Sequence, residues 1–230
     1  MTLELVIGNK NYSSWSLRAW LHLRESRIPF RETRIALFQD GFRETLERYT
    51  PAGRVPVLID GDLPVWDSMA IIEHVRERFP EALGWPTDAA ARAMARSIAA
   101  EMHAGFLAVR DELPQNLRAR RPRPLESLSE ACRGQIARID EMWTTARREH
   151  GEEGPWLFGE MSIADIVYAP VALRFVTYGI PVGEESRGFV DAVCALDSVR
   201  EFVDAARAER EHLDFIDDLV PTAGSPLTPG

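Results

Sequence analysis

Apolar and polar residues follow two different periods in the first 80 residues of the chain. Four short apolar-rich runs bounded by turn-forming residues have strand character; they cover 3–7, 30–38, 55–59 and 63–66. Helices are predicted over 14–27 and 68–79, where apolar residues recur at helical spacing, and over 42–49, a short segment with charges on one face. The predicted order is strand, helix, strand, helix, then a hairpin turning at Asp60-Gly61-Asp62 and a closing helix.

This order, βαβ-α-ββα, predicts a thioredoxin-like α/β domain over residues 1–80. After a linker at 81–88, the pattern predicts only helices; they cover 89–110, 128–149, 162–178 and 199–210. We therefore expect an all-α C-terminal domain over residues 89–220. Residues 221–230 are rich in proline, glycine and serine, and we expect a disordered tail there.

Charge and cysteine content narrow the classes of function. A formal net charge of −9 argues against binding a phosphate backbone, so we expect no nucleic-acid partner. We interpret the basic run Arg118–Pro124 as a solvated loop. The two cysteines, Cys132 and Cys194, form no close pair, which disfavours a disulfide framework, a redox motif and a metal site. The sequence shows neither a signal-peptide pattern nor a membrane-spanning apolar run, so we expect a cytoplasmic protein without a membrane partner.

Two serines, Ser13 and Ser14, stand where the first predicted strand gives way to the first helix. A helix N-terminus offers unpaired backbone N–H groups and the positive end of the macrodipole. Serine at that place either caps the helix or donates its hydroxyl to an anion held there, such as a thiolate. The sequence alone leaves both interpretations open.

Two further pairs of residues have the chemistry of a peptide-binding site. Pro56 opens the third strand, and a cis Val55-Pro56 bond would turn the Val55 peptide groups toward an extended ligand. Asp67 and Ser68 open the next helix, where they can bind an ammonium and a carboxylate or can simply cap. By contrast, we interpret Ser162-Ile163-Ala164-Asp165 as a structural capping box.

The four motifs, in this order and on this pattern of elements, resemble the cytosolic glutathione S-transferases over nearly the whole chain. Ser13-Ser14-Trp15-Ser16 is similar to the serine motif of zeta-class enzymes, with tryptophan where that motif carries cysteine. The segment Ala100–Phe106 is also similar to a group of bacterial transferases. The resemblance implies a serine-type transferase that uses glutathione as co-substrate in detoxification and forms a homodimer.

The resemblance also implies roles for particular residues. Ser13, or Ser14 in a shifted alignment, would stabilise the glutathione thiolate. Val55, cis Pro56, Asp67 and Ser68 would bind glutathione, with Arg54 and Gln39 as further contacts. The electrophile would lie near Trp15, His103 and Phe106. The alternatives are a glutathione-dependent isomerase or peroxidase on the same fold and a non-catalytic glutathione-binding module.

Overall fold

The computed structural model describes residues 3–151 and 154–218. Its α/β part holds a four-stranded sheet in the order β2-β1-β3-β4, with β1 parallel to β2 and antiparallel to β3. The strands are β1 (Leu3–Ile7), β2 (Phe30–Arg34), β3 (Val57–Asp60) and β4 (Leu63–Trp66). The first helices are α1 (Ser14–Glu25), α2 (Phe42–Glu47) and α3 (Ser68–Arg78). This is the predicted thioredoxin-like order, and the expected fold class is confirmed.

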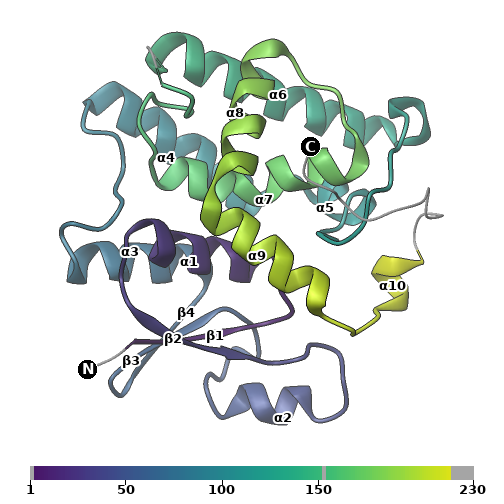
Figure 1. Cartoon of the computed structure of the whole chain (residues 1–230). Coiled ribbons are helices and arrows are strands. Elements are labelled where there is room, and N and C mark those ends of the chain that lie inside the picture. Colours follow the sequence, from purple (N-terminus) through teal and green to yellow (C-terminus); the bar gives the residue numbers. More distant parts are fainter. Residues whose placement is uncertain (1–2, 152–153, 219–230) are drawn as a thin grey trace.

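The central strand β1 carries apolar residues that are buried on both faces of the sheet, and its one polar residue, Glu4, is half-buried. Leu5 and Ile7 belong to the large core under α1 and α3, whereas Val6 belongs to a smaller core under α2. Figure 1 shows this arrangement, with α2 on one side of the sheet and α1 and α3 on the side that faces the helical part.

The helical part is built around α7 (Ile163–Tyr178), whose residues are nearly all buried. The other helices are α4 (Ala89–Ala104), α5 (Leu107–Glu112), α6 (Glu130–His150), α8 (Glu184–Ala195), α9 (Asp197–Ala208) and α10 (Asp214–Asp217), with a 3-10 turn at Leu125–Ser127. The Asp165 carboxylate accepts hydrogen bonds from the Ser162 backbone at 2.8 Å and from the Leu157 backbone at 2.9 Å. The interpretation of the Ser162 motif as a capping box is therefore confirmed.

Three sequence-based predictions need correction. The predicted helix over 89–110 is interrupted at Gly105 and Phe106, because Phe106 takes a left-handed backbone conformation with φ of 59°. The second strand ends at Arg34 rather than at residue 38, since its last pairing bond to β1 joins Ile35 to Ile7. Helix α8 was not predicted. The expected tail at 221–230 and residues 219–220 lie outside the described residues.

The basic loop at 118–124 is also not a solvated connection. Arg118 donates to the carbonyl oxygens of Glu209 at 3.0 Å and Glu211 at 2.8 Å, and Arg121 donates to Ile216 at 3.0 Å. The buried carboxylate of Asp217 lies among these arginines, 3.3 Å from Arg118 and 3.7 Å from Arg121. The loop is ordered because it holds the C-terminal segment 209–217 in place.

The same segment reaches back to the N-terminal end of α1. The Glu209 carboxylate accepts hydrogen bonds from the backbone N–H groups of Lys10 at 2.7 Å and Asn11 at 3.0 Å. The Tyr12 hydroxyl donates to the carboxylate of Asp217. Residues nearly 200 positions apart thus fix the turn that precedes Ser13. Among the described residues, no helix is long and apolar enough to cross a membrane.

Candidate functional site

The two serines at the N-terminal end of α1 have different partners. Ser13 is the N-cap: its Oγ accepts from the Ser16 backbone N–H at 3.2 Å and donates to the Ser16 Oγ at 2.8 Å. The Ser16 Oγ in turn accepts from the backbone N–H of Gly8 at 3.0 Å, which ties the end of β1 to α1. The Ser13 hydroxyl is therefore engaged within its own helix.

Ser14 points to the helical part instead. Its Oγ accepts a hydrogen bond from Nη2 of Arg174 on α7 at 3.0 Å. The hydroxyl has no other protein partner among the described residues. Because a hydroxyl accepts through oxygen and donates through its hydrogen, the Ser14 proton remains available to a ligand.

A cavity of about 660 Å³ lies beside the N-terminal ends of α1 and α3. Its volume suits a small peptide ligand. Its wall consists of Trp15, Ala52, Arg54, Val55, Pro56, Trp66, Asp67, Ser68, His103 and Ala104. Seven of the eleven predicted site residues therefore line one cavity: Trp15, Arg54, Val55, Pro56, Asp67, Ser68 and His103.

One wall of the cavity is an unpaired stretch of backbone before β3. The Val55-Pro56 bond is cis, and pairing between β3 and β4 begins only at Val57 with Trp66. Val55 therefore lies outside the sheet ladder. Its peptide groups make no backbone hydrogen bond to the described residues, and they are suited to pair with an extended ligand.

Another wall is the start of α3. Asp67 is the N-cap, and its Oδ1 accepts from the Met69 backbone N–H at 2.8 Å. The Ser68 side chain is fully buried, yet its Oγ has no hydrogen-bond partner among the described residues. A buried hydroxyl without a partner at a helix N-terminus is suited to an anionic group of a ligand.

His103 of α4 contacts Asp67 at the cavity wall. Its Nε2 lies 3.4 Å from Oδ2 of Asp67, and its ring meets the Trp15 ring edge-on at 5.1 Å between centroids. Burial lowers the pKa of His103, although the nearby Asp67 charge opposes this effect. Burial thus favours the neutral form of the His103 imidazole beside the Asp67 carboxylate.

Four predicted site residues do not line this cavity. Ser13 and Ser14 are buried and immediately precede Trp15, which does line the cavity. Phe106 packs in the main core, and Gln39 is exposed in the segment between β2 and α2. Arg174 at the site was not predicted, since arginine inside a helical pattern carries no signal of burial.

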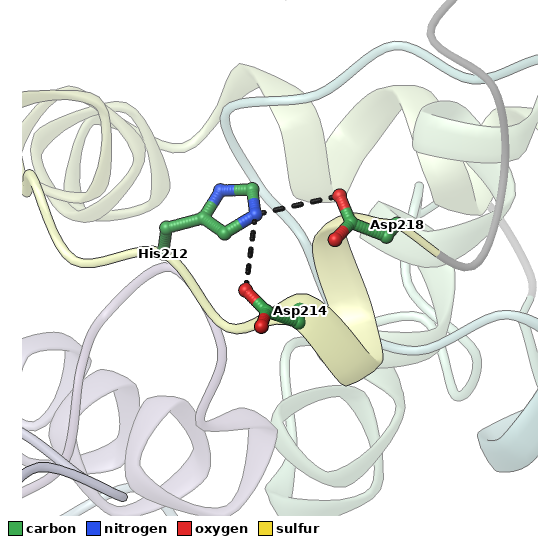
Figure 2. A group of neighbouring side chains, drawn as sticks. All are labelled: His212, Asp214 and Asp218. Atoms are coloured by element: carbon green, nitrogen blue, oxygen red, sulfur yellow. Dashed lines mark ion pairs between the residues drawn. The ribbon is translucent and has the colours of Figure 1, made fainter.

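A separate group of side chains lies at α10, where His212, Asp214 and Asp218 approach one another (Figure 2). The His212 Nε2 is 3.5 Å from Asp214 and 3.4 Å from Asp218, and all three side chains are exposed. These contacts are surface ion pairs at a four-residue helix, and we assign no metal to them.

Comparison with known proteins agrees with the geometry of the N-terminal part. Residues 12–78 match the family described as the glutathione S-transferase N-terminal domain. Dichloromethane dehalogenase of Methylorubrum extorquens is 38% identical over 63 residues, which are 26% of this chain and 22% of that protein. Glutathione S-transferase 1 of Dianthus caryophyllus is 35% identical over 94 residues, which are 40% of this chain and 41% of that protein. The chain therefore matches less than half the length of these curated relatives.

Solved structures extend the likeness to both parts of the chain. A glutathione transferase homolog from Burkholderia GL BGR1, determined with bound glutathione, aligns with a TM-score of 0.68 at 23% identity. The alignment covers 91% of this chain and 100% of the other. The fold is that of the glutathione transferases.

Proposed function

We propose that this protein is a glutathione transferase that binds glutathione in the cavity beside α1 and α3 and activates its thiol for attack on a small electrophile. One observation carries the proposal. One cavity is lined by the Val55 backbone outside the sheet ladder, by Asp67 and by Ser68, whose hydroxyl has no partner among the described residues. Trp15, at the start of α1, lines the same cavity. These are the groups that an extended peptide with an amino-acid head requires.

Each end of glutathione has a matching group. The cysteinyl backbone pairs with the peptide groups of Val55, as an added strand does. The γ-glutamyl carboxylate accepts a hydrogen bond from the Ser68 hydroxyl at the N-terminus of α3. The γ-glutamyl ammonium forms an ion pair with Asp67. Arg54 is on the cavity wall and is a better candidate for the glycine carboxylate than Gln39, which lies outside the wall.

Ser14 is the preferred thiol-activating residue, and Ser13 is the alternative. The Ser13 hydroxyl is used in capping α1, whereas the Ser14 hydroxyl accepts from Arg174 and keeps its own proton to donate. A hydrogen bond donated to the sulfur stabilises the thiolate, and the α1 dipole adds to this effect. This reverses the order of preference that the sequence motif suggests.

The finer features of the proposal rest on the resemblance. The enzyme is of the serine type, related to zeta-class or bacterial transferases, and assembles as a homodimer in the cytoplasm. The electrophile lies against Trp15 and His103, on the side of the cavity formed by α1 and α4. Sedimentation velocity at two protein concentrations tests the homodimer directly.

The test combines calorimetry with glutathione and ultraviolet thiolate absorbance of the bound ligand across pH. We expect binding, together with ionisation of the bound thiol well below its pKa in solution. Ser14→Ala should lower kcat toward an activated aryl halide by about 100-fold while KM for glutathione changes little. Ser13→Ala is the matched control, because it removes the neighbouring hydroxyl and leaves the Ser14 contact in place.

The other outcomes separate the alternatives. Binding without thiol ionisation favours a non-catalytic glutathione-binding module. Ionisation without conjugation, but with turnover of a hydroperoxide or a cis-trans isomerisable substrate, favours the peroxidase or isomerase. Absence of glutathione binding refutes the proposed function.

A further inference from the structure

Three arginines meet behind the candidate thiol site, one from each of three helices. Arg18 on α1 and Arg174 on α7 are 1% and 5% exposed, and Arg110 lies on α5. The guanidinium groups of Arg18 and Arg110 lie 4.6 Å and 4.7 Å from the centre of the Trp15 ring. Two arginines of the cluster therefore contact Trp15, a residue of the cavity wall, and the third contacts the neighbouring Ser14.

All the acceptors of the cluster are uncharged. Arg18 Nε donates to the Val167 carbonyl at 3.0 Å, and Arg110 Nε donates to the Gly105 carbonyl at 3.0 Å. Arg174 donates to the Pro170 carbonyl at 3.4 Å as well as to Ser14. No carboxylate among the described residues lies within 4.0 Å of these three guanidinium groups.

The cluster thus holds positive charge that no carboxylate of the described residues neutralises by direct contact; Asp67 acts on Arg18 only from a greater distance. Arg18 Nη1 and Arg174 Nε are buried and have no hydrogen-bond partner in the described part of the chain. Burial, followed by repulsion from Arg110, lowers the pKa of Arg18 and of Arg174 to about 9. Both therefore keep their charge at pH 7. Uncompensated buried charge is costly, and such arrangements are concentrated at functional sites.

We propose that Arg174 is a positioning residue that acts through Ser14, and that Arg18 and Arg110 supply further positive charge, so that the cluster stabilises the thiolate of bound glutathione. The inference rests on the proposed function. The charged hydrogen bond from Arg174 fixes the Ser14 hydroxyl and polarises its O–H bond toward the ligand. The thiolate then supplies the negative charge that the cluster lacks.

Other ionisable groups face the cluster and must be considered in any pH profile. On the cavity side these are Asp67, whose charge acts on Arg18, and His103, whose pKa the Arg18 charge lowers further. On the α7 side Tyr168 faces Arg18 and Tyr178 faces Arg174. Burial raises the pKa of both tyrosines, so they stay neutral while a glutathione thiol titrates. Asp67 is the one carboxylate of the set.

Arg174→Met tests the proposal, because it removes the charge and the bond to Ser14 and retains much of the side-chain length. Thiolate absorbance of bound glutathione is measured across pH, and S-methylglutathione binding is measured by calorimetry. S-methylglutathione has no ionisable thiol, so it reports on the binding site alone. We expect about tenfold less thiolate at a given pH below the midpoint, a rise of about one unit in the thiol pKa, with S-methylglutathione affinity unchanged.

Two controls support the assignment. Arg200→Met makes the same charge change on α9 at a side chain that is 55% exposed, and it should leave the thiol profile unchanged. In the Ser14→Ala background, Arg174→Met should have a smaller effect than in the natural chain, because the two residues act as one unit.

The possible results are distinct. If Arg174→Met binds S-methylglutathione normally and its thiol profile equals that of the natural chain, the proposal is wrong. If the natural chain binds neither glutathione nor S-methylglutathione, the proposed function is wrong, and the role of the arginine cluster that rests on it is wrong as well. If Arg174→Met does not fold, Arg110→Met replaces it, since Arg110 is less buried. A shift in the same direction supports the cluster, and an unchanged profile overturns it.

Discussion

His22 of α1 should make the protein less stable between pH 7 and pH 5. The side chain is fully buried, and its Nε2 lies 2.9 Å from the Leu83 carbonyl, while Nδ1 has no partner among the described residues. Burial lowers the pKa of His22 from 6.5 to about 4, although the bond to Leu83 opposes the shift. The folded protein therefore keeps this imidazole neutral.

The free energy of unfolding decreases at acid pH because the unfolded state binds a proton at His22 that the folded state does not bind. Below pH 6.5 the unfolded chain takes up a proton at His22 and the folded chain does not, so stability falls as pH falls from about 6.5 to about 4. Linkage with these two pKa values gives a loss of about 2 kcal/mol in the free energy of unfolding between pH 7 and pH 5, and of about 3 kcal/mol in full. Above pH 7 the histidine contributes almost no pH dependence.

Urea unfolding of the natural chain and of His22→Gln at pH 7 and pH 5 measures this contribution. The glutamine amide keeps a donor for Leu83 but does not titrate. We expect the variant to be less stable at pH 7, because its shape differs, yet to lose about 2 kcal/mol less than the natural chain on going to pH 5. Equal losses in the two proteins would refute the reasoning.

Three further changes follow from other contacts. Asp165→Ala leaves two buried backbone donors without an acceptor and should lower the free energy of unfolding by about 3–5 kcal/mol, measured by urea unfolding. Burial alone would raise the pKa of Asp217, but hydrogen bonds from Tyr12, Leu213 and Asn116 and the Arg118 charge outweigh it and lower the pKa. Asp217→Asn should therefore lower the free energy of unfolding by about 3 kcal/mol at pH 7. The difference in this free energy between the variant and the natural chain should become smaller as pH falls below about 4. Arg138→Ala removes exposed ion pairs to Glu101 and Glu141 and should change the melting temperature little, a cost under about 1 kcal/mol.

Local sequence patterns were sufficient for most of the α/β part. β1 and β4 begin and end where the apolar runs do, and α1 and α3 begin at the predicted residues. The break at Phe106 could not be predicted, because only tertiary contacts hold a bulky residue at a φ of 59°. The sequence pattern did not predict α8, because its few apolar residues follow Gly188, which disfavours a helix.

In the candidate site, too, local motifs predicted some residues, whereas residues placed by tertiary contacts could not be predicted. Residues carried by motifs, such as Val55, Asp67 and Ser68, come together in one cavity as the motifs predict. Arg174 lies 160 residues from Ser14 in the chain, and no local pattern connects the two. The sequence also did not predict that Arg121 is buried, because a basic run interrupted by proline is ordinarily solvated.

The contact between Glu209 and the turn before α1 has a consequence for how the protein is made. Synthesis proceeds from the N-terminus, so the sheet and α1 leave the ribosome long before residue 209 exists. Throughout that interval the backbone N–H groups of Lys10 and Asn11 lack the carboxylate that holds them in the finished molecule. A nascent chain therefore carries every residue of the cavity wall before Glu209 can fix the turn that precedes Ser13.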